Sequence, residues 1–391
     1  MNMTRARIGP GDADVLLLLK SGLEERVEAV LRGEAPREFF YSFFGLLENG
    51  IDTRIMNTSE PYTGVAAQAI HVGERIFSRI SGISIRRQYL AGLRPQWARA
   101  KVLASFMDHF SLTMGNYFCG RRDRPFTIGF FHGFSDIPHH ISPLGRCILN
   151  RYVRRALEGL DVVGFFGPAD RAEAVRRWDL PEAKTALVRF GVDQSFWTPA
   201  AAERGNDGRD FKVLSIGSDP NRDYDTLVSA RLPCPVTIIT RLPVKRTPDA
   251  ANVEVTEGSF WKSPLTDAVL RGLYRDAGVV VVPLHDVFQP SGYSVTLQAM
   301  ACGRPVVLSR NKGLWTPEYL KDGENCLLIP PGDPAALRAA VESLRDDRAL
   351  AARIGTAGRK TVDDHFTIEA MNRSMVPLVQ RGLAARAEAR R

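Results

Sequence analysis

The sequence predicts an α/β fold with parallel β-sheets, arranged as two domains. The runs at residues 14–19 and 278–283 are almost entirely apolar, as expected of strands buried on both faces of a parallel sheet. A glycine-containing turn and a helical stretch follow each run, which is the order of a βαβ unit. The chain has 391 residues, of which 44% are hydrophobic and 25% charged, so its length suits two globular domains.

Composition narrows the class of protein. The five cysteines show no CxxC pairing and no histidine at metal-ligand spacing, so we expect reduced thiols in a cytoplasmic protein and no metal site. Residues 1–14 have no apolar core, and therefore do not predict a signal peptide. The formal net charge of +8 favours an anionic partner, either a nucleotide diphosphate or an anionic lipid surface. Without a nucleic-acid-binding motif, we expect no nucleic acid partner.

In the N-terminal half, apolar runs predict strands over residues 14–19, 51–56, 100–106, 126–131 and 160–166. Helices are expected between them, including a long helical region over 64–99 that carries arginines such as Arg75 and Arg79 among apolar positions. These arginines form either a solvated face or a basic face that lies on an anionic membrane.

His132 directly follows the strand predicted at 126–131. The carboxyl edge of a parallel sheet is where ligands bind in open α/β sheets. His132 is therefore either a structural residue or a residue that faces a ligand.

The C-terminal half repeats the alternation after a polar linker at 200–210. Apolar runs predict strands over 212–218, 236–240, 252–258, 278–283 and 306–308, and helices are expected from residue 221 and over 295–302, 334–345, 347–364 and 367–383. Asp333 is the expected N-cap of the helix that starts at Pro334.

Residues 288–308 combine a turn, a helix and a strand. Pro290, Ser291 and Gly292 predict the turn; Ser294 is the expected N-cap, and Gly303 is expected to end the helix. A helix N-terminus presents unpaired N–H groups and the positive end of the helix dipole, which together favour phosphate.

Three motifs resemble the retaining family 4 glycosyltransferases. Residues 298–307, Gln-Ala-Met-Ala-Cys-Gly-Arg-Pro-Val-Val, resemble the second half of their donor-binding signature. Residues 188–199 and 322–333 resemble two further segments of that family. The chain departs from the pattern where Gln289 and Gln298 replace two glutamates, and where Ser218 and Arg222 stand for an arginine and a lysine that grip the donor diphosphate.

The resemblance implies a GT-B fold, in which two Rossmann-like domains face each other across a cleft. The N-terminal domain, 1–200, would bind the acceptor and the C-terminal domain, 201–366, the donor. The helix 367–391 would pack back on the N-terminal domain. The implied reaction moves a sugar from a nucleotide diphosphate sugar to a hydroxyl of a sugar or lipid-linked acceptor, with retention and without a metal or other cofactor. It would serve glycan or glycolipid biosynthesis, such as that of cell-surface polysaccharide, in the cytoplasm or peripherally on the inner face of the membrane.

The resemblance also implies roles for individual residues. His132 and Arg222 are the expected catalytic residues: His132 would lie close to the transferring sugar, and Arg222, in a surface turn, would grip the diphosphate. Gln298 would hydrogen-bond the ribose and Gln289 the donor sugar, and Arg241 would supply the charge missing at Ser218. The expected donor-binding residues are Gly217, Ser218, Arg222, Arg241, Gln289, Ser291, Gly292, Tyr293, Ser294, Val295 and Gln298.

Two other functions stay open. A nucleotide-sugar 2-epimerase shares this fold, although the motifs match family 4 better. A non-catalytic nucleotide-sugar-binding protein would also fit, because both signature glutamates and the arginine at position 218 are missing.

Overall fold

The structure is a computed structural model. It describes residues 7–9, 11–20, 22–57, 65–81, 83–134, 142–200, 211–245, 250–258 and 265–388. The predicted linker therefore lies outside the described residues from position 201 to position 210.

The chain forms two compact units, and each is assembled from separate stretches of sequence. Unit 1 consists of Met1–Leu31, Phe40–Arg189 and Met371–Arg391, and unit 2 consists of Arg32–Phe39 and Phe190–Ala370. We expected the division at residue 200, whereas the chain passes into unit 2 at Phe190. The short segment 32–39, which has no counterpart in the expected division, also belongs to unit 2.

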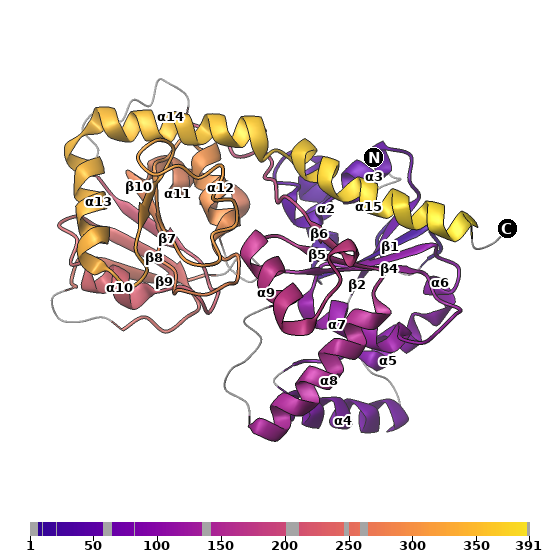
Figure 1. Ribbon diagram of the computed structural model, residues 1–391. Coiled ribbons are helices and arrows are strands. Elements are labelled where there is room, and N and C mark those ends of the chain that lie inside the picture. The colour runs from indigo at the N-terminus through magenta and orange to yellow at the C-terminus, as the bar shows by residue number, and fades with distance from the viewer. Residues whose placement is uncertain are drawn as a thin grey trace. The chain divides into compact units, whose positions relative to one another are not determined.

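Unit 1 is built on a six-stranded parallel sheet with strand order β2-β1-β3-β4-β5-β6 (Figure 1). Its strands are β1 (Val15–Leu19), β2 (Thr53–Asn57), β3 (Val102–Ser105), β4 (Phe126–Phe131), β5 (Val162–Phe165) and β6 (Thr185–Leu187). Its helices are α2 (Leu23–Leu31), α3 (Phe43–Glu48), α4 (Val65–Ser81), α5 (Arg87–Gly92), α6 (Arg94–Trp97), α7 (Asp108–Phe118), α8 (Pro143–Gly159), α9 (Pro168–Trp178) and most of α15 (Ile368–Glu388). Helix α7 packs on β3 and β4 and against α8, and α4 lies outside that layer against α8.

Unit 2 also contains a six-stranded parallel sheet, with strand order β12-β11-β10-β7-β8-β9. Its strands are β7 (Val213–Ile216), β8 (Val236–Thr240), β9 (Val253–Glu257), β10 (Val279–Val282), β11 (Val306–Ser309) and β12 (Leu327–Ile329). Its helices are α10 (Tyr224–Ser229), α11 (Asp267–Asp276), α12 (Tyr293–Ala301), α13 (Pro334–Asp346) and α14 (Arg348–His365). Helix α12 packs on β10 and β11 and against α14 (Figure 1).

The predicted α/β fold with parallel sheets is confirmed in both units. Every residue of β1 and β3 in unit 1, and of β10 and β11 in unit 2, is buried, as expected of strands that are covered on both faces. Asp333 caps α13 as predicted, because its Oδ1 accepts a hydrogen bond from the Ala336 N–H at 2.9 Å. No helix in the described ranges combines the length and the apolar character that crossing a membrane requires.

Candidate functional site

The strand order of unit 2 reverses between β7 and β10, which are neighbours in the sheet although far apart in sequence. The chain leaves these two strands in opposite directions, and in open α/β sheets this arrangement leaves a crevice at the carboxyl ends of the two strands. This is where ligands bind in open α/β sheets. Two loops lead away from it, residues 217–223 after β7 and residues 283–292 after β10, and the second leads directly into helix α12.

Helix α12 begins at Tyr293, with Gly292 as its N-cap at a φ of 78°. The prediction that Ser294 caps a helix from residue 295 is therefore wrong. The cause is the left-handed glycine, which turns the chain into the helix two residues earlier. A Cβ at Gly292 would lie 2.7 Å from Val282 Cγ1, so the tight approach also requires glycine. The C-terminal end is as predicted, because Gly303 follows the helix at a φ of 71°.

The start of α12 has no side-chain cap. Gly292 has no side chain that could cap the helix, and no side-chain cap hydrogen bond is present. The first N–H groups of a helix have no partner within the helix, and a phosphate or carboxylate is a suitable acceptor for them.

Arg222 is the predicted site residue whose environment in the structure differs most from the prediction. It is only 6% exposed, so the prediction of a side chain in a surface turn is wrong. Its backbone forms an isolated antiparallel bridge with Leu284, which holds the residue against the segment after β10. The guanidinium lies between two glycines. A Cβ at Gly217 would be 2.7 Å from Arg222 Cζ, and one at Gly292 would be 3.5 Å from Nη1.

Two N–H groups of this buried guanidinium, at Nε and Nη1, have no hydrogen-bond partner among the described residues. Nearby Asp223 does not serve them. Its carboxylate accepts hydrogen bonds from the N–H and the hydroxyl of Thr226, and so caps α10. Burial of a charge without a partner is costly, so a site of this kind indicates an anionic ligand that completes it.

The loop around Arg222 is held in place by its neighbours. Asn221 Nδ2 donates a hydrogen bond to Ser291 Oγ at 3.2 Å, and the Asp223 N–H donates to Pro283 O at 3.0 Å. These bonds join the loop after β7 to the loop after β10. The guanidinium is therefore positioned before any ligand arrives.

Arg222 also lines a hollow of about 350 Å³ at this edge of unit 2. The lining residues are Pro220, Arg222, Asp223, Tyr224, Asp225, Leu242, Pro243, Lys245 and His285. The volume falls in the range of small-molecule sites. Basic and acidic groups both border it, so it suits a ligand that carries phosphate together with hydrogen-bonding groups.

Gln298 lies in a buried network instead of facing open space. Its Oε1 accepts a hydrogen bond from Tyr274 Oη at 3.1 Å, and its Nε2 donates to Glu38 Oε1 at 3.0 Å. Both ends of the amide are thus bonded within the protein. A role in binding ribose stays a prediction, and it would require one of these bonds to be exchanged.

Glu38 was not singled out in the sequence, yet it is fully buried in unit 2. Its carboxylate accepts hydrogen bonds from Trp197 Nε1 at 2.7 Å, from Gln298 Nε2 and from the Asp193 N–H at 3.1 Å. Burial outweighs these bonds and raises the pKa of Glu38 to about 7. The available signal was a single acidic residue in the aromatic run at 38–44.

Of the remaining predicted donor residues, six lie beside Arg222 or in the first turn of α12, and three lie elsewhere in unit 2. Gly217, Ser291 and Gly292 lie around Arg222, and Tyr293, Ser294 and Val295 form the first turn of α12. Ser218 instead ties neighbouring loops together, since its hydroxyl accepts from the Arg241 N–H at 2.9 Å and donates to Gly258 O at 3.3 Å. The Arg241 side chain is exposed, and Gln289 is half-buried in the loop before α12.

His132 lies in unit 1, just after β4. Its ring stacks on Phe166 with centroids 4.6 Å apart, and its Nε2 lies 3.0 Å from both Tyr41 Oη and Phe106 O. Its backbone N–H donates to Asp108 Oδ1 at 2.8 Å. Burial lowers the pKa of His132, which favours a neutral imidazole. Tyr41 adopts a φ of 50°, a left-handed conformation that non-glycine residues seldom take.

Within the described residues, no group of three or more His, Cys, Asp or Glu side chains could hold a metal ion.

The family match found by comparison with known proteins lies in unit 2. Residues 201–347 match the family model described as Glycosyl transferases group 1. An alpha-maltose-1-phosphate synthase of Mycobacterium tuberculosis is 31% identical over 212 residues, which cover 46% of this chain and 52% of that protein. A D-inositol 3-phosphate glycosyltransferase of Acidothermus cellulolyticus is 37% identical over 181 residues, covering 46% of this chain and 38% of that protein. The chain thus spans about half or less of the length of these relatives.

Among solved structures, a sucrose-phosphate synthase from Thermosynechococcus elongatus superposes with a TM-score of 0.67 at 19% identity, covering 95% of this chain and 99% of that one. Anabaena HepE, solved in complex with UDP and glucose, superposes with a TM-score of 0.62 at 15% identity, covering 94% and 99%. At such identities the likeness concerns the fold. The chain therefore has the GT-B fold of glycosyltransferases, and its residues 201–347 match the group 1 glycosyl transferases.

Proposed function

We propose that this protein is a retaining glycosyltransferase that transfers a sugar from a nucleoside diphosphate sugar to an acceptor hydroxyl. The match of residues 201–347 to the group 1 family and the GT-B fold support this proposal. The similarity to HepE, which was solved with UDP and glucose, supports a nucleoside diphosphate sugar as the donor.

The observation that carries the proposal is the buried Arg222 beside the uncapped start of α12. When the bond between the sugar and the diphosphate breaks, negative charge develops on the leaving phosphate. The unpartnered Nε and Nη1 groups of Arg222 and the first N–H groups of α12 are donors held in place before the reaction. Preorganised donors stabilise developing charge more than flexible ones, because they need no reorganisation during the reaction.

The other steps are assigned to further residues as part of the proposal. The acceptor oxygen bonds to the anomeric carbon on the face that the diphosphate leaves, as the bond from that carbon to the diphosphate oxygen breaks. The proton of the acceptor hydroxyl passes to the leaving diphosphate. Neutral His132 would contact the transferring sugar, while Gln289 and Gln298 would bind the donor sugar and the ribose. Arg241 is the expected additional phosphate contact. We further propose that the transfer needs no metal and serves cytoplasmic synthesis of a glycan or glycolipid.

One observation favours a second candidate, a non-catalytic nucleotide-sugar-binding protein. Gln298 stands where the family has glutamate, and its amide is already bonded to Glu38 and Tyr274. A donor site that lacks both signature glutamates would still bind the diphosphate through Arg222.

A single assay distinguishes these functions. The full chain is incubated with a panel of nucleoside diphosphate sugars and simple acceptors, and free nucleoside diphosphate and the sugar are analysed. A transferase releases nucleoside diphosphate in step with a new glycoside, and this release should fall in Arg222→Met. A 2-epimerase would change the configuration of the sugar, and a binding protein would only raise its melting temperature. Either of the last two results would refute the proposed transfer.

A further inference from the structure

Helix α4 exposes an apolar row to its surroundings. Val72 and Ile76 are each 54% exposed and Ile80 is 43% exposed, and their spacing of four residues places them in one row along the helix. Seven large hydrophobic side chains are exposed among the described residues, and four of them, including Ile70, belong to α4. Such a concentration on one helix indicates an interaction surface, whereas exposed hydrophobic residues that are scattered singly do not.

The other side of α4 is packed, so the apolar row is the outward face of a fixed helix. Phe77 lies against Tyr152 of α8 with ring centroids 5.1 Å apart. Glu74 is buried and accepts a hydrogen bond from the Gln88 N–H at 3.3 Å. Leu144, 70% exposed, adds another apolar side chain on the first turn of α8.

A basic row runs beside the apolar one. Arg75 and Arg79 precede Ile76 and Ile80 by one residue each, both are exposed, and neither side chain forms an ion pair with a described residue. With Arg86 they line a hollow of about 210 Å³. Its lining residues are His71, Glu74, Arg75, Ser78, Arg79, Ser84, Ile85 and Arg86.

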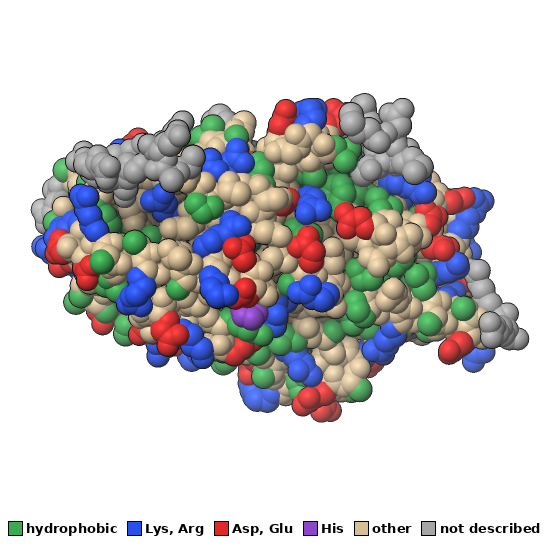
Figure 2. Space-filling model, turned by 90° about the horizontal axis from the view of Figure 1, so that it is seen from above, with side chains coloured by type: hydrophobic (Ala, Val, Ile, Leu, Met, Phe, Trp, Pro, Cys, Tyr) green, Lys and Arg blue, Asp and Glu red, His purple; other side chains and the backbone are tan. Residues whose placement is uncertain are grey.

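The charge of this hollow is one-sided. It contains three guanidinium groups and a single carboxylate, and that carboxylate, Glu74, is buried. By contrast, the face shown in Figure 2 has Lys and Arg side chains interspersed with Asp and Glu, as on an ordinary solvated surface. The region around Arg75 and Arg79 therefore fits an anionic partner.

We propose that α4 docks this protein on a bilayer that contains anionic phospholipid. The row of Val72, Ile76 and Ile80 enters the boundary between headgroups and acyl chains, and Arg75, Arg79 and Arg86 bind lipid phosphates at the hollow. A helix with one apolar face bordered by arginines lies in the plane of such an interface. A second copy of the chain fits less well, because symmetric pairing would place the two basic rows against each other.

The test is co-sedimentation of the full chain with vesicles of phosphatidylcholine alone and of phosphatidylcholine mixed with phosphatidylglycerol. We expect binding to the mixed vesicles that weakens with added salt. Arg75→Gln with Arg79→Gln should reduce that binding by roughly fivefold for each arginine lost. Ile76→Ser with Ile80→Ser should reduce it even at low salt. All four positions are exposed, so we expect unchanged melting temperatures.

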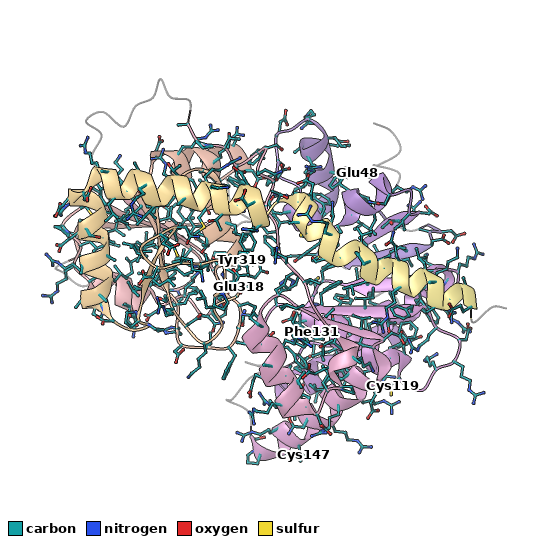
Figure 3. All side chains as sticks on the ribbon, turned by 45° about the horizontal axis from the view of Figure 1, so that its top comes forward. Glu48, Cys119, Phe131, Cys147, Glu318 and Tyr319 are labelled. Carbon is teal, nitrogen blue, oxygen red and sulfur yellow. The ribbon has the colours of Figure 1, made fainter. Side chains whose placement is uncertain are left out.

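Matched controls are available in the same chain. Arg176→Gln on α9 removes an exposed helical arginine, and Val269→Ser on α11 removes an exposed helical valine, and neither should change vesicle binding. Exposed Cys147, near the start of α8 in Figure 3, can carry an environment-sensitive dye in a Cys119→Ser background. Its emission should shift to the blue when mixed vesicles are added.

Three results would overturn the proposal. One is absence of binding to mixed vesicles, and another is binding that the α4 variants do not weaken. The third is a concentration-dependent dimer that Ile76→Ser with Ile80→Ser abolishes, since that would assign the apolar row to a second copy. None of these results depends on sugar transfer, so they leave the proposed function to its own assay.

Discussion

Replacing Arg222 by methionine should weaken nucleoside diphosphate binding without destabilising the empty protein. Methionine keeps much of the volume of arginine and removes the charge. In the empty protein the guanidinium is 6% exposed, and its Nε and Nη1 groups lack partners. Replacement of buried ion pairs by apolar residues of similar volume is commonly neutral, or stabilising by about 1–4 kcal/mol, and a buried charge whose groups lack partners should be no harder to replace.

The effect on binding should have the opposite sign. A hydrogen bond to a charged group contributes about 1.5–3 kcal/mol. Loss of one such bond corresponds to a decrease in affinity of roughly tenfold to a hundredfold. Arg222→Lys should retain part of the affinity, because it keeps the positive charge but loses the planar fork that binds two phosphate oxygens.

Calorimetric titration with a nucleoside diphosphate and chemical denaturation of the same samples measure both quantities. Arg338→Met is the control, since Arg338 is an exposed arginine of unit 2 that pairs with Glu342 on α13. It should change neither the affinity nor, beyond a few tenths of a kcal/mol, the stability. Equal affinity of wild type and Arg222→Met would remove Arg222 from the site, and the donor assignment would lose its main support.

Three further predictions concern single positions. Gly217→Ala should lower nucleoside diphosphate affinity as Arg222→Met does, because the new Cβ would displace the guanidinium; titration that shows wild-type affinity would contradict this. His132→Ala should lower kcat and kcat/KM together while leaving the donor Kd unchanged, and a folded variant with full turnover would make His132 a structural residue. Folded Glu38, with its pKa near 7, holds a proton that the unfolded chain releases near 4.5, so its contribution to stability falls as pH rises between these values and is constant above them. The difference in unfolding free energy between wild type and Glu38→Gln should therefore decrease across this window, by on the order of 3 kcal/mol, and parallel curves would refute the shifted pKa.

Much of the fold could be predicted because its determinants are local. The strand at 236–240 and the glycine at position 303 depend on apolar runs and on a left-handed helix end, which neighbouring residues specify. The same holds for Asp333 as an N-cap. The loops of the candidate site were also predictable, since the carboxyl ends of β7 and β10 follow from the βαβ order.

The environment of individual site residues could not be predicted, because it depends on distant parts of the chain. Arg222 is buried because its backbone pairs with Leu284, and no sequence pattern near position 222 predicts that bridge. Gln298 was expected to face a ligand, yet its Nε2 is bonded to Glu38, which comes from the other half of the sequence. Ser294 was chosen as a cap from its residue type, whereas the backbone of Gly292 determines where the helix begins.

The division of the chain into alternating segments has a consequence for its synthesis. When Arg32–Phe39 leaves the ribosome, Trp197 and Gln298, which bond Glu38 in the finished protein, have not yet been made. In the same way, unit 1 is incomplete until Met371–Arg391 has been synthesised. N-terminal domains usually fold first during synthesis, but here unit 2 has all its segments once Ala370 has emerged, and unit 1 only after Met371–Arg391 has followed.

The segment around Glu38 must therefore remain available while most of the chain is translated. Trypsin cleavage after Arg37, whose side chain is bonded to Asp193 in the finished protein, would follow this step. Ribosome-bound chains that stop before residue 298 should be cut there, and the released full-length protein should resist. Resistance in the shorter chains would mean that the segment finds its place without Gln298. A chain whose units interleave in this way delays the final packing of unit 1 until Met371–Arg391 has been made, and until then its unfinished apolar surfaces must be kept from aggregating.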